Sequence, residues 1–245
     1  MNVITLDFET YYDTEHSLAH LSAVQYVHSP LFKVWGVGIK MNDEPTEWFG
    51  AEECADAIAQ IQWAEAAVVC HNTLFDAYIL TQYYKVYPKY YYDTAAMARG
   101  LAPNESSSLK NTCERMFPND KTMRKGDELV NAKGIFDLPP DIEDQIAGYC
   151  IQDVDLTYAL YNVMQPTYPQ SELDLIDLTC RMYVEPKLFL NRTLLQAHKD
   201  DIATNTAQLI TASGLTRAQL ASQKQFAEHL ESLNITVPTK KSQRT

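Results

Sequence analysis

A carboxylate lies on the apolar face of the longest helix that this sequence predicts. Helical spacing covers residues 141–164, and Asp153 falls on the apolar stripe, one turn after Tyr149. An ionised carboxylate that is buried without a partner costs enough free energy to shift its pKa and become neutral. The bases nearest in the sequence are distant, so we expect a bound metal ion to compensate the charge. The fold must then bring further metal ligands to Asp153. The rest of the stripe consists of Ile142, Ile146, Cys150, Leu156 and Leu160.

Two further acidic positions accompany short apolar runs in the first third of the chain. Residues 2–8 are typical of a strand, in which alternation places Asp7 and Glu9 together on the face opposite the apolar side chains, about 7 Å apart. Asp76 lies in the first turns of a helix that follows the apolar run 66–70. A solvated strand end or the helix dipole would also account for such acids. Each position alone is therefore a weak signal.

The four acids Asp7, Glu9, Asp76 and Asp153 together carry a charge that two divalent cations would neutralise. Ligand sets made of oxygen favour Mg²⁺ or Mn²⁺ over zinc. Two such ions about 4 Å apart serve in-line displacement at phosphorus, because they stabilise both the attacking and the leaving oxygen. The pattern therefore favours a two-metal enzyme that acts on phosphate esters.

Three short motifs resemble a known enzyme family. Residues 7–9 (Asp-Phe-Glu) resemble exonuclease motif I, and residues 71–76 (His-Asn-Thr-Leu-Phe-Asp) resemble motif II. Residues 149–153 (Tyr-Cys-Ile-Gln-Asp) resemble the Tyr-x-x-x-Asp form of motif III. Their order and separations are similar to those of the DEDDy 3′–5′ exonucleases, the proofreading domains of family-A DNA polymerases, and most of all to the bacteriophage branch. The histidine subclass would have His at the position of Gly148, so the tyrosine subclass is indicated.

The resemblance implies a fold and a role for each motif residue. The fold would be an α/β, ribonuclease H-like mixed sheet flanked by helices, followed by a helical C-terminal segment. Asp7, Glu9 and Asp153 would bind one metal ion. Asp76 would hold the second ion, to which Asp7 would bridge. Tyr149 would orient the attacking water by a hydrogen bond. Because its unperturbed pKa is about 10, it need not be the base.

Residues beside the motifs are candidates for substrate contacts. Asn72 would either tether the substrate or stabilise the turn of motif II, and both roles stay open. Thr10, Tyr11 and Tyr12 would meet the 3′-terminal nucleotide. His71 is expected to be structural.

The net charge limits how this chain can bind nucleic acid. It has 20 Lys and Arg against 32 Asp and Glu, a formal charge of −12, which argues against coating duplex DNA by bulk charge. We therefore expect local contacts to a single-stranded 3′ end. Lys121, Arg124 and Lys125, in the loop-rich stretch 118–140, either touch phosphates or only solvate that loop.

The character of the sequence changes near residue 168, where strand signals fade. We expect an exonuclease domain over 1–168 and an incomplete helical segment over 169–245, which resembles the start of a polymerase region. The sequence ends before any palm carboxylates, so we expect that this chain does not polymerise. Helices are predicted at 170–184, 192–212 and 222–233.

The first domain is predicted to alternate strands and helices. Asp93 is the expected N-cap of one of these helices. The predicted strands lie at 2–8, 32–41, 47–49, 66–70 and 90–92, and the predicted helices at 51–63, 74–84, 94–101 and 141–164.

The remaining features concern cellular context. No apolar run approaches the ~18 residues that span a bilayer, and the N-terminus lacks the basic region of a signal peptide. The 5 cysteines contain no Cys-x-x-Cys pair, which favours a reducing compartment. We expect a monomer without membrane partners in the cytoplasm, that of the host if a phage encodes the protein.

The sequence thus predicts a metal-dependent 3′–5′ exonuclease that releases nucleoside monophosphates from single-stranded DNA, as the proofreading part of a polymerase in DNA replication. The remainder of that polymerase would be its partner. An RNase D-like RNA exonuclease would share the same four acids. A non-catalytic structural domain is the third alternative, and retention of Tyr149 and all four acids weighs against it.

Overall fold

The computed structural model describes residues 1–125 and 131–237. It divides into two compact units, Met1–Lys187 and Leu188–Thr245. Residues 126–130 of the predicted loop and the predicted end of the helical segment, 238–245, lie outside the described residues.

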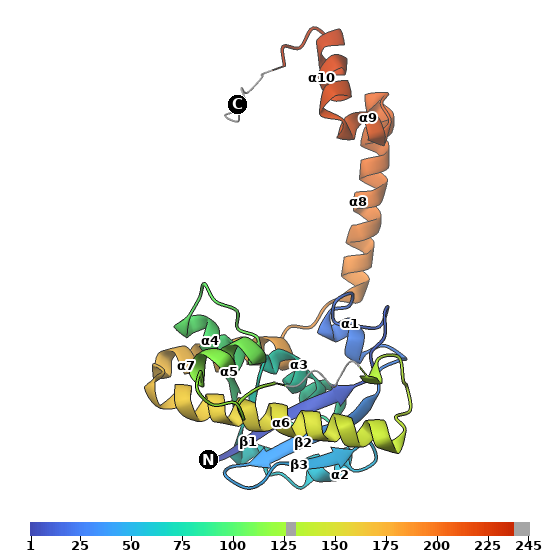
Figure 1. The fold of residues 1–245 in the computed structure, drawn as a ribbon. Coiled ribbons are helices and arrows are strands. Elements are labelled where there is room, and N and C mark those ends of the chain that lie inside the picture. The colour runs from blue at the N-terminus through green and yellow to red at the C-terminus, as the bar shows by residue number, and fades with distance from the viewer. Residues whose placement is uncertain (126–130, 238–245) are drawn as a thin grey trace. The chain divides into compact units, whose positions relative to one another are not determined.

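A five-stranded mixed sheet forms the centre of the first unit (Figure 1). The strand order is β3-β2-β1-β4-β5, in which β2 pairs antiparallel with β1 and β3, while β4 pairs parallel with β1 and β5. All five predicted strands are present. Their bounds are β1 Asn2–Thr10, β2 Val34–Met41, β3 Glu47–Gly50, β4 Ala66–Cys70 and β5 Tyr90–Asp93.

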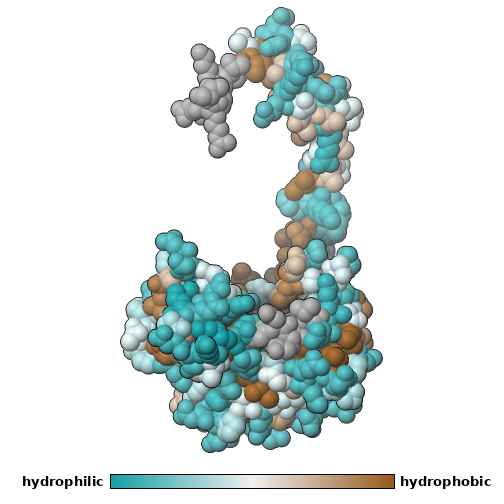
Figure 2. Space-filling view, in the orientation of Figure 1, coloured by the Kyte–Doolittle hydropathy of each residue, from teal (hydrophilic) through white to brown (hydrophobic). Residues whose placement is uncertain are grey.

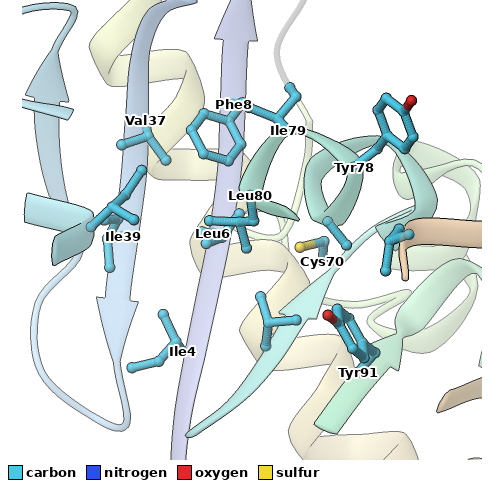
Figure 3. Packing of buried hydrophobic residues seen from close by; sticks show 14 of the residues in the cluster. Ile4, Leu6, Phe8, Val37, Ile39, Cys70, Tyr78, Ile79, Leu80 and Tyr91 are labelled. Carbon is cyan, nitrogen blue, oxygen red and sulfur yellow. The ribbon is translucent and has the colours of Figure 1, made fainter. Parts of the chain in front are cut away.

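The central strand β1 separates the two faces of the sheet, as the sequence alternation predicts. Ile4, Leu6 and Phe8 lie in the larger hydrophobic core, where they pack with side chains of β2 and β4 (Figure 3). Because successive side chains of a strand alternate, Asp7 and Glu9 project to the other face.

Helices cover both faces of the sheet. The face with the larger core is covered by α2 (Cys54–Ala59), α3 (Thr73–Tyr78) and α7 (Gln170–Val184). The opposite face is covered by α4 (Thr94–Leu101), α5 (Leu109–Met116) and α6 (Pro140–Met164), whose buried residues form a second core with β4. The acidic face of β1 is therefore the face on which α6 lies.

The long helix α6 begins as its sequence predicts. Pro140 occupies the first turn, where its missing N–H has no partner to lose. Asp141 and Glu143 follow in the same turn, and their charge complements the helix dipole.

The first unit is longer than the predicted domain 1–168. Leu173, Cys180 and Val184 of α7 are buried in the two cores, and the Tyr91 amide of β5 donates a hydrogen bond to Asp177 Oδ1 at 2.9 Å. The change of sequence character at 168 marks the end of the strands, whereas the core continues through α7. The first compact unit ends at Lys187, and the exonuclease domain over 1–168 stays a prediction.

Several helices differ from their predicted extent. The predicted helix 74–84 divides into α3 and a π-helix, η2 (Ile79–Tyr83), where the Thr81 hydroxyl donates to the Ala77 carbonyl at 2.9 Å. Such a bond to the preceding turn bends helices. The predicted helix 51–63 is shorter, as α2. Short helices that periodicity does not predict are α1 (Ala23–Val27), α5, η1 (Trp63–Glu65), η4 (Gln165–Thr167) and α9 (Arg217–Ala221).

The second unit is helical, as predicted. It contains α8 (Arg192–Ser213), α9 and α10 (Gln223–Ser232), and none of their described residues is buried. Apolar side chains are spread along it (Figure 2). Leu188 and Phe189, which precede α8, are 94% and 96% exposed.

Among the described residues, no helix has both the length and the apolar character needed to cross a membrane. The five cysteines are all buried free thiols.

Candidate active site

Asp7 and Glu9 lie beneath α6 because the sheet allows a close approach there. Gly38 pairs with Asp7 across β1 and β2. A Cβ atom at Gly38 would lie 2.9 Å from Cys150 Sγ and 3.1 Å from Val154 Cγ2. The absence of a side chain at this position therefore lets α6 pack directly against the acidic end of β1.

Tyr149 and Asp153 stand one turn apart on α6, on the face that packs against the sheet. Tyr149 is 7% exposed and Asp153 is 4% exposed. The apolar stripe predicts this burial, because Leu156 and Leu160 continue the same face into the second core.

Asp76 reaches the same place from the other side of β1. It lies in the first turn of α3, which starts directly after β4 and the turn at 71–72. Its Oδ1 accepts a hydrogen bond from the Phe8 amide at 3.0 Å. This bond fixes Asp76 beside the backbone between Asp7 and Glu9.

The four predicted carboxylates and Tyr149 line one cavity of about 340 Å³. These five residues come from three different elements: β1, α3 and α6. The other lining residues are Phe8, Thr10, Tyr12, Ser17, Leu18, Tyr26, His71, Asn72, Phe75, Leu109, Lys125 and Thr157.

The carboxylates raise one another's pKa. Burial, and then the neighbouring charge of Asp153, raises the pKa of Asp7 to about 7. Burial and the charge of Asp7 likewise raise the pKa values of Glu9 and Asp76 well above their usual range. Glu9 is 5% exposed, and its side chain forms no hydrogen bond or ion pair with another described residue. A bound cation would offset the mutual repulsion of these carboxylates.

One positively charged side chain of the protein already lies beside these carboxylates. The Lys125 ammonium group forms an ion pair with Asp153 Oδ2 and lies 4.4 Å from the centre of the Tyr149 ring. The prediction that no base lies close to Asp153 is wrong. Lys125 and Asp153 are 28 positions apart in the sequence. Their contact depends on how the chain folds back on itself, which local sequence patterns do not predict.

Tyr149 is held in its protonated form. Burial raises the pKa of its hydroxyl above the ordinary value, and the carboxylates of Asp153 and Glu9 raise it further. The hydroxyl can therefore donate or accept a hydrogen bond at neutral pH, but it does not ionise.

The turn that carries Asn72 is tied to the end of β5. Asn72 adopts a left-handed backbone conformation with φ of 73°, and its amide donates to Asp93 Oδ1 at 3.0 Å. The same oxygen accepts bonds from Ala95 and Ala96 at the start of α4, so Asp93 is the predicted N-cap.

His71 joins this turn to the segment before α5. Its Nε2 lies 2.8 Å from the Ser107 carbonyl oxygen, and its Nδ1 lies 2.9 Å from Thr94 Oγ1. Because a carbonyl oxygen only accepts, Nε2 carries the proton. Burial lowers the pKa of His71, which keeps the ring neutral.

The residues after motif I point in different directions. Thr10 lines the cavity, and so does Tyr12. Tyr11, which the sequence analysis proposed as a substrate contact, instead packs in a third apolar cluster with Trp35 and donates its hydroxyl proton to Asp13 at 2.6 Å. In a regular strand, alternation would have placed Tyr11, and not Thr10, on the face of Asp7 and Glu9. The pairing shifts between Glu9 and Thr10, so the alternation does not continue past Glu9.

Part of the chain is similar to a known protein family. Residues 54–168 match the family described as 3′-5′ exonuclease. The match covers less than half of the chain and shows a similarity of that stretch to this family. It includes Asp76, Tyr149 and Asp153, whereas β1 precedes it. A search of curated proteins found no match.

Solved structures share the fold. RNase D of Trypanosoma brucei has a TM-score of 0.50 at 15% identity, over 66% of this chain and 57% of that chain. Its complex with RNA U12 gives 0.50 at 14% identity, over 75% and 62%. The catalytic core of RRP6 from the same organism gives 0.52 at 14% identity, over 89% of this chain and 54% of that chain.

These likenesses concern the fold alone. They confirm the predicted class, a ribonuclease H-like mixed sheet flanked by helices with a helical C-terminal part. The chain spans 57% of the length of the RNase D chain that it matches.

Proposed function

We propose that this chain is a metal-dependent 3′–5′ exonuclease that hydrolyses the terminal phosphodiester of single-stranded DNA and releases nucleoside monophosphates. One observation carries the proposal: Asp7, Glu9, Asp76 and Asp153 converge with Tyr149 on a single cavity. The match of residues 54–168 to the exonuclease family supports the reaction class.

The donor set fits divalent cations. Carboxylate oxygens are the ligands that Mg²⁺ and Mn²⁺ prefer, and the buried Glu9 carboxylate has no protein donor among the described residues. Asp7, Glu9 and Asp153 would hold one ion, and Asp76, with Asp7, the second. When bound, two such ions acidify a water molecule and stabilise the leaving 3′ oxygen.

Tyr149 positions the attacking water. Its hydroxyl stays protonated because of burial and the adjacent acids, so it holds the water by a hydrogen bond and does not remove its proton.

Lys125 contacts Asp153 in the metal-free site and the substrate when metal ions are bound. In the metal-free site its ammonium group neutralises Asp153. With a cation bound at Asp153, Lys125, which lines the cavity, would be released from this ion pair and would contact a phosphate oxygen of the substrate.

The substrate end lies over the turn of motif II and the end of β1. Asn72 and Thr10 line that part of the cavity and contact the 3′-terminal nucleotide. Tyr11 acts indirectly, because its hydroxyl bond to Asp13 and its packing hold the backbone beside Thr10.

The proposed biological role is proofreading within a DNA polymerase in the cytoplasm, with the rest of that polymerase as partner. The similarity of residues 169–245 to the start of a polymerase region supports DNA over RNA. The net charge of −12 supports a substrate held locally at its 3′ end.

A degradation assay tests the proposal. DNA and RNA single strands of one sequence, labelled at the 5′ end, are incubated with the protein in Mg²⁺, Mn²⁺ or EDTA. We expect a ladder of DNA products shortened from the 3′ end, release of nucleoside monophosphates, and no product in EDTA. The variant Asp7→Ala should be inactive, and Asp155→Ala, which changes an exposed acid of α6, should be active.

Each arm of the assay decides between alternatives. Faster degradation of RNA would replace the DNA proposal by an RNase D-like activity. Degradation in EDTA would contradict the metal site. No degradation of either strand in both metals would favour a structural domain.

A further inference from the structure

A groove of about 690 Å³ lies beside the edge of the sheet, outside the proposed active site. Its lining residues come mainly from β2, the turn after it, β3 and α2, which lies beside β3 (Figure 1). None of them lines the cavity that contains the four carboxylates of the proposed nuclease. The proposed function therefore does not account for this groove.

The rim of the groove is acidic. Five exposed carboxylates line it, and none of its described lining residues is basic. Within the part of the chain that the structure describes, none of the five forms an ion pair. Their charge is therefore open to a ligand. The five residues are Glu44, Glu47, Glu52, Glu53 and Asp56.

The floor of the groove is apolar. Ile39 of β2 is buried, whereas Phe49 of β3 and Ile61 after α2 are half-buried. Met41, at the end of β2, is 39% exposed. Apolar surface that is still open to solvent gains free energy when a partner covers it. A ligand that fits this groove combines positive charge with apolar side chains.

The groove borders a free edge of the sheet. In the order β3-β2-β1-β4-β5, β3 is the outermost strand, and no other strand among the described residues pairs with its outer side. Glu47 and Phe49 lie two positions apart on β3, so they share the face that lines the groove. A segment that adds to this edge as a further strand places its own alternate side chains over the same face.

We propose that this groove binds a basic, extended segment of a partner protein. Lys or Arg and an apolar residue recur at alternate positions of that segment, so that both face the groove. The cations meet the five carboxylates, and the apolar side chains cover Met41 and Phe49.

Other ligands fit the groove less well. Its acids repel a nucleic acid or an anionic membrane surface. A metal ion needs ligands close together, and among the described residues these carboxylates form no set of three whose ligand atoms lie within 4.8 Å of one another. A second copy of this chain would bring one acidic edge against another, and charged side chains on an edge strand hinder such pairing.

The test measures the binding of fluorescent peptides by anisotropy. The test peptide repeats Lys-Thr-Val-Thr, which places lysine and valine on one face of an extended strand. A control peptide of the same composition repeats Lys-Val-Thr-Thr, which places them on opposite faces. The measurement needs neither metal ions nor nuclease activity, so it is independent of the proposed function.

Three variants locate the bound peptide. The groove variant, Glu44→Gln/Glu47→Gln/Asp56→Asn, neutralises one acid each in the turn after β2, in β3 and in α2. Met41→Gln replaces an apolar side chain of the floor. The surface variant neutralises the same number of exposed acids outside the groove, so its net charge equals that of the groove variant. Its substitutions are Glu105→Gln, Glu114→Gln and Asp144→Asn. Circular dichroism checks that all variants fold.

We expect the wild type and the surface variant to bind the test peptide with nearly the same affinity. The groove variant should bind it about 5- to 50-fold more weakly, because each exposed ion pair changes an affinity by about 1.5- to 5-fold. Met41→Gln should also bind it more weakly. The wild type should bind the control peptide less tightly than the test peptide, and added salt should weaken binding.

Equal affinities of the groove and surface variants would overturn the proposal, because net charge alone would then explain the binding. A wild type that does not bind the test peptide at low salt, or that binds both peptides equally, would overturn it as well. Analytical ultracentrifugation of the protein alone tests the other occupant. A dimer that the groove variant loses would assign the groove to a second copy of this chain and contradict the proposal.

Discussion

The ammonium group of Lys125 forms an ion pair with Asp153 and lies 4.4 Å from the centre of the Tyr149 ring. It lowers the pKa values of Asp7 and Glu9, against the larger effect of burial. The metal-free site is thus partly neutralised by a side chain of the protein itself. A divalent cation that binds Asp153 has to displace this side chain.

This competition predicts the behaviour of Lys125→Met. The metal-free variant should be less stable by about 1–2 kcal/mol, below the 3–5 kcal/mol of a fully buried pair, because Lys125 is partly exposed. It should bind Mn²⁺ more tightly than the wild type, since no ammonium group competes. Thermal unfolding and calorimetric titration measure the two effects. Lys125→Arg keeps the charge and serves as the control, and weaker Mn²⁺ binding by Lys125→Met would contradict the competition.

Glu9→Gln should separate stability from activity. Glu9 is buried, lacks a protein donor among the described residues, and is repelled by Asp7 and Asp153. Its neutral analogue should therefore raise the stability of the metal-free protein by about 1 kcal/mol and abolish degradation. Asp155→Asn, at an exposed acid that accepts a hydrogen bond from Thr46, is the control. A less stable Glu9→Gln would show that the carboxylate is needed for folding.

The pH dependence follows from Asp7. Its pKa rises from 3.8 to about 7 on folding, so between these values the folded protein holds a proton that the unfolded chain has lost. This contribution to stability is complete below about pH 4 and is lost as the pH rises through 7.

We therefore expect the metal-free protein to have a lower Tm at pH 8 than at pH 5.5. In a domain of this size about 1 kcal/mol corresponds to about 2–4 °C. Mg²⁺ should reduce the difference, because it binds the ionised form. Differential scanning calorimetry with EDTA or Mg²⁺ measures this, with Asp7→Asn as the variant in which the difference shrinks. A Tm that rises steadily to pH 8 in EDTA would contradict the assignment.

Tyr149→Phe tests the water-positioning role. Loss of the hydroxyl should lower turnover by an amount at or below the about 10²–10⁴-fold typical of a positioned proton-handling group. Mn²⁺ affinity should hardly change, because the hydroxyl is not a metal ligand in this proposal. Single-turnover degradation and calorimetry give the two values. A large loss of Mn²⁺ affinity would mean that the tyrosine supports a ligand.

The sequence predicts much of this fold because the informative patterns are local. Alternation in β1 predicts which side chains face the core, and the stripe of α6 predicts that Asp153 is buried. The boundary after Lys187 and the Lys125–Asp153 pair depend on contacts between distant segments. The hydrogen bond from Asn72 to Asp93 is of the same kind. Periodicity and capping residues carry no information on such contacts.

The last prediction concerns Asp93, whose Oδ1 caps α4 and also holds the Asn72 amide. Asp93→Ala should cost about 1 kcal/mol for the lost cap and about 0.5–1.5 kcal/mol for the lost hydrogen bond of the Asn72 amide. Asp93→Asn keeps an acceptor oxygen and should cost much less. Ser108→Ala removes the cap of α5, whose hydroxyl oxygen accepts from the Asn111 amide and the exposed Ser106 hydroxyl, so it gives the approximate cost of a cap without the Asn72 bond. Hydrogen exchange of the Asn72 amide should accelerate in Asp93→Ala only, and equal exchange in all three variants would show that this bond does not hold the turn.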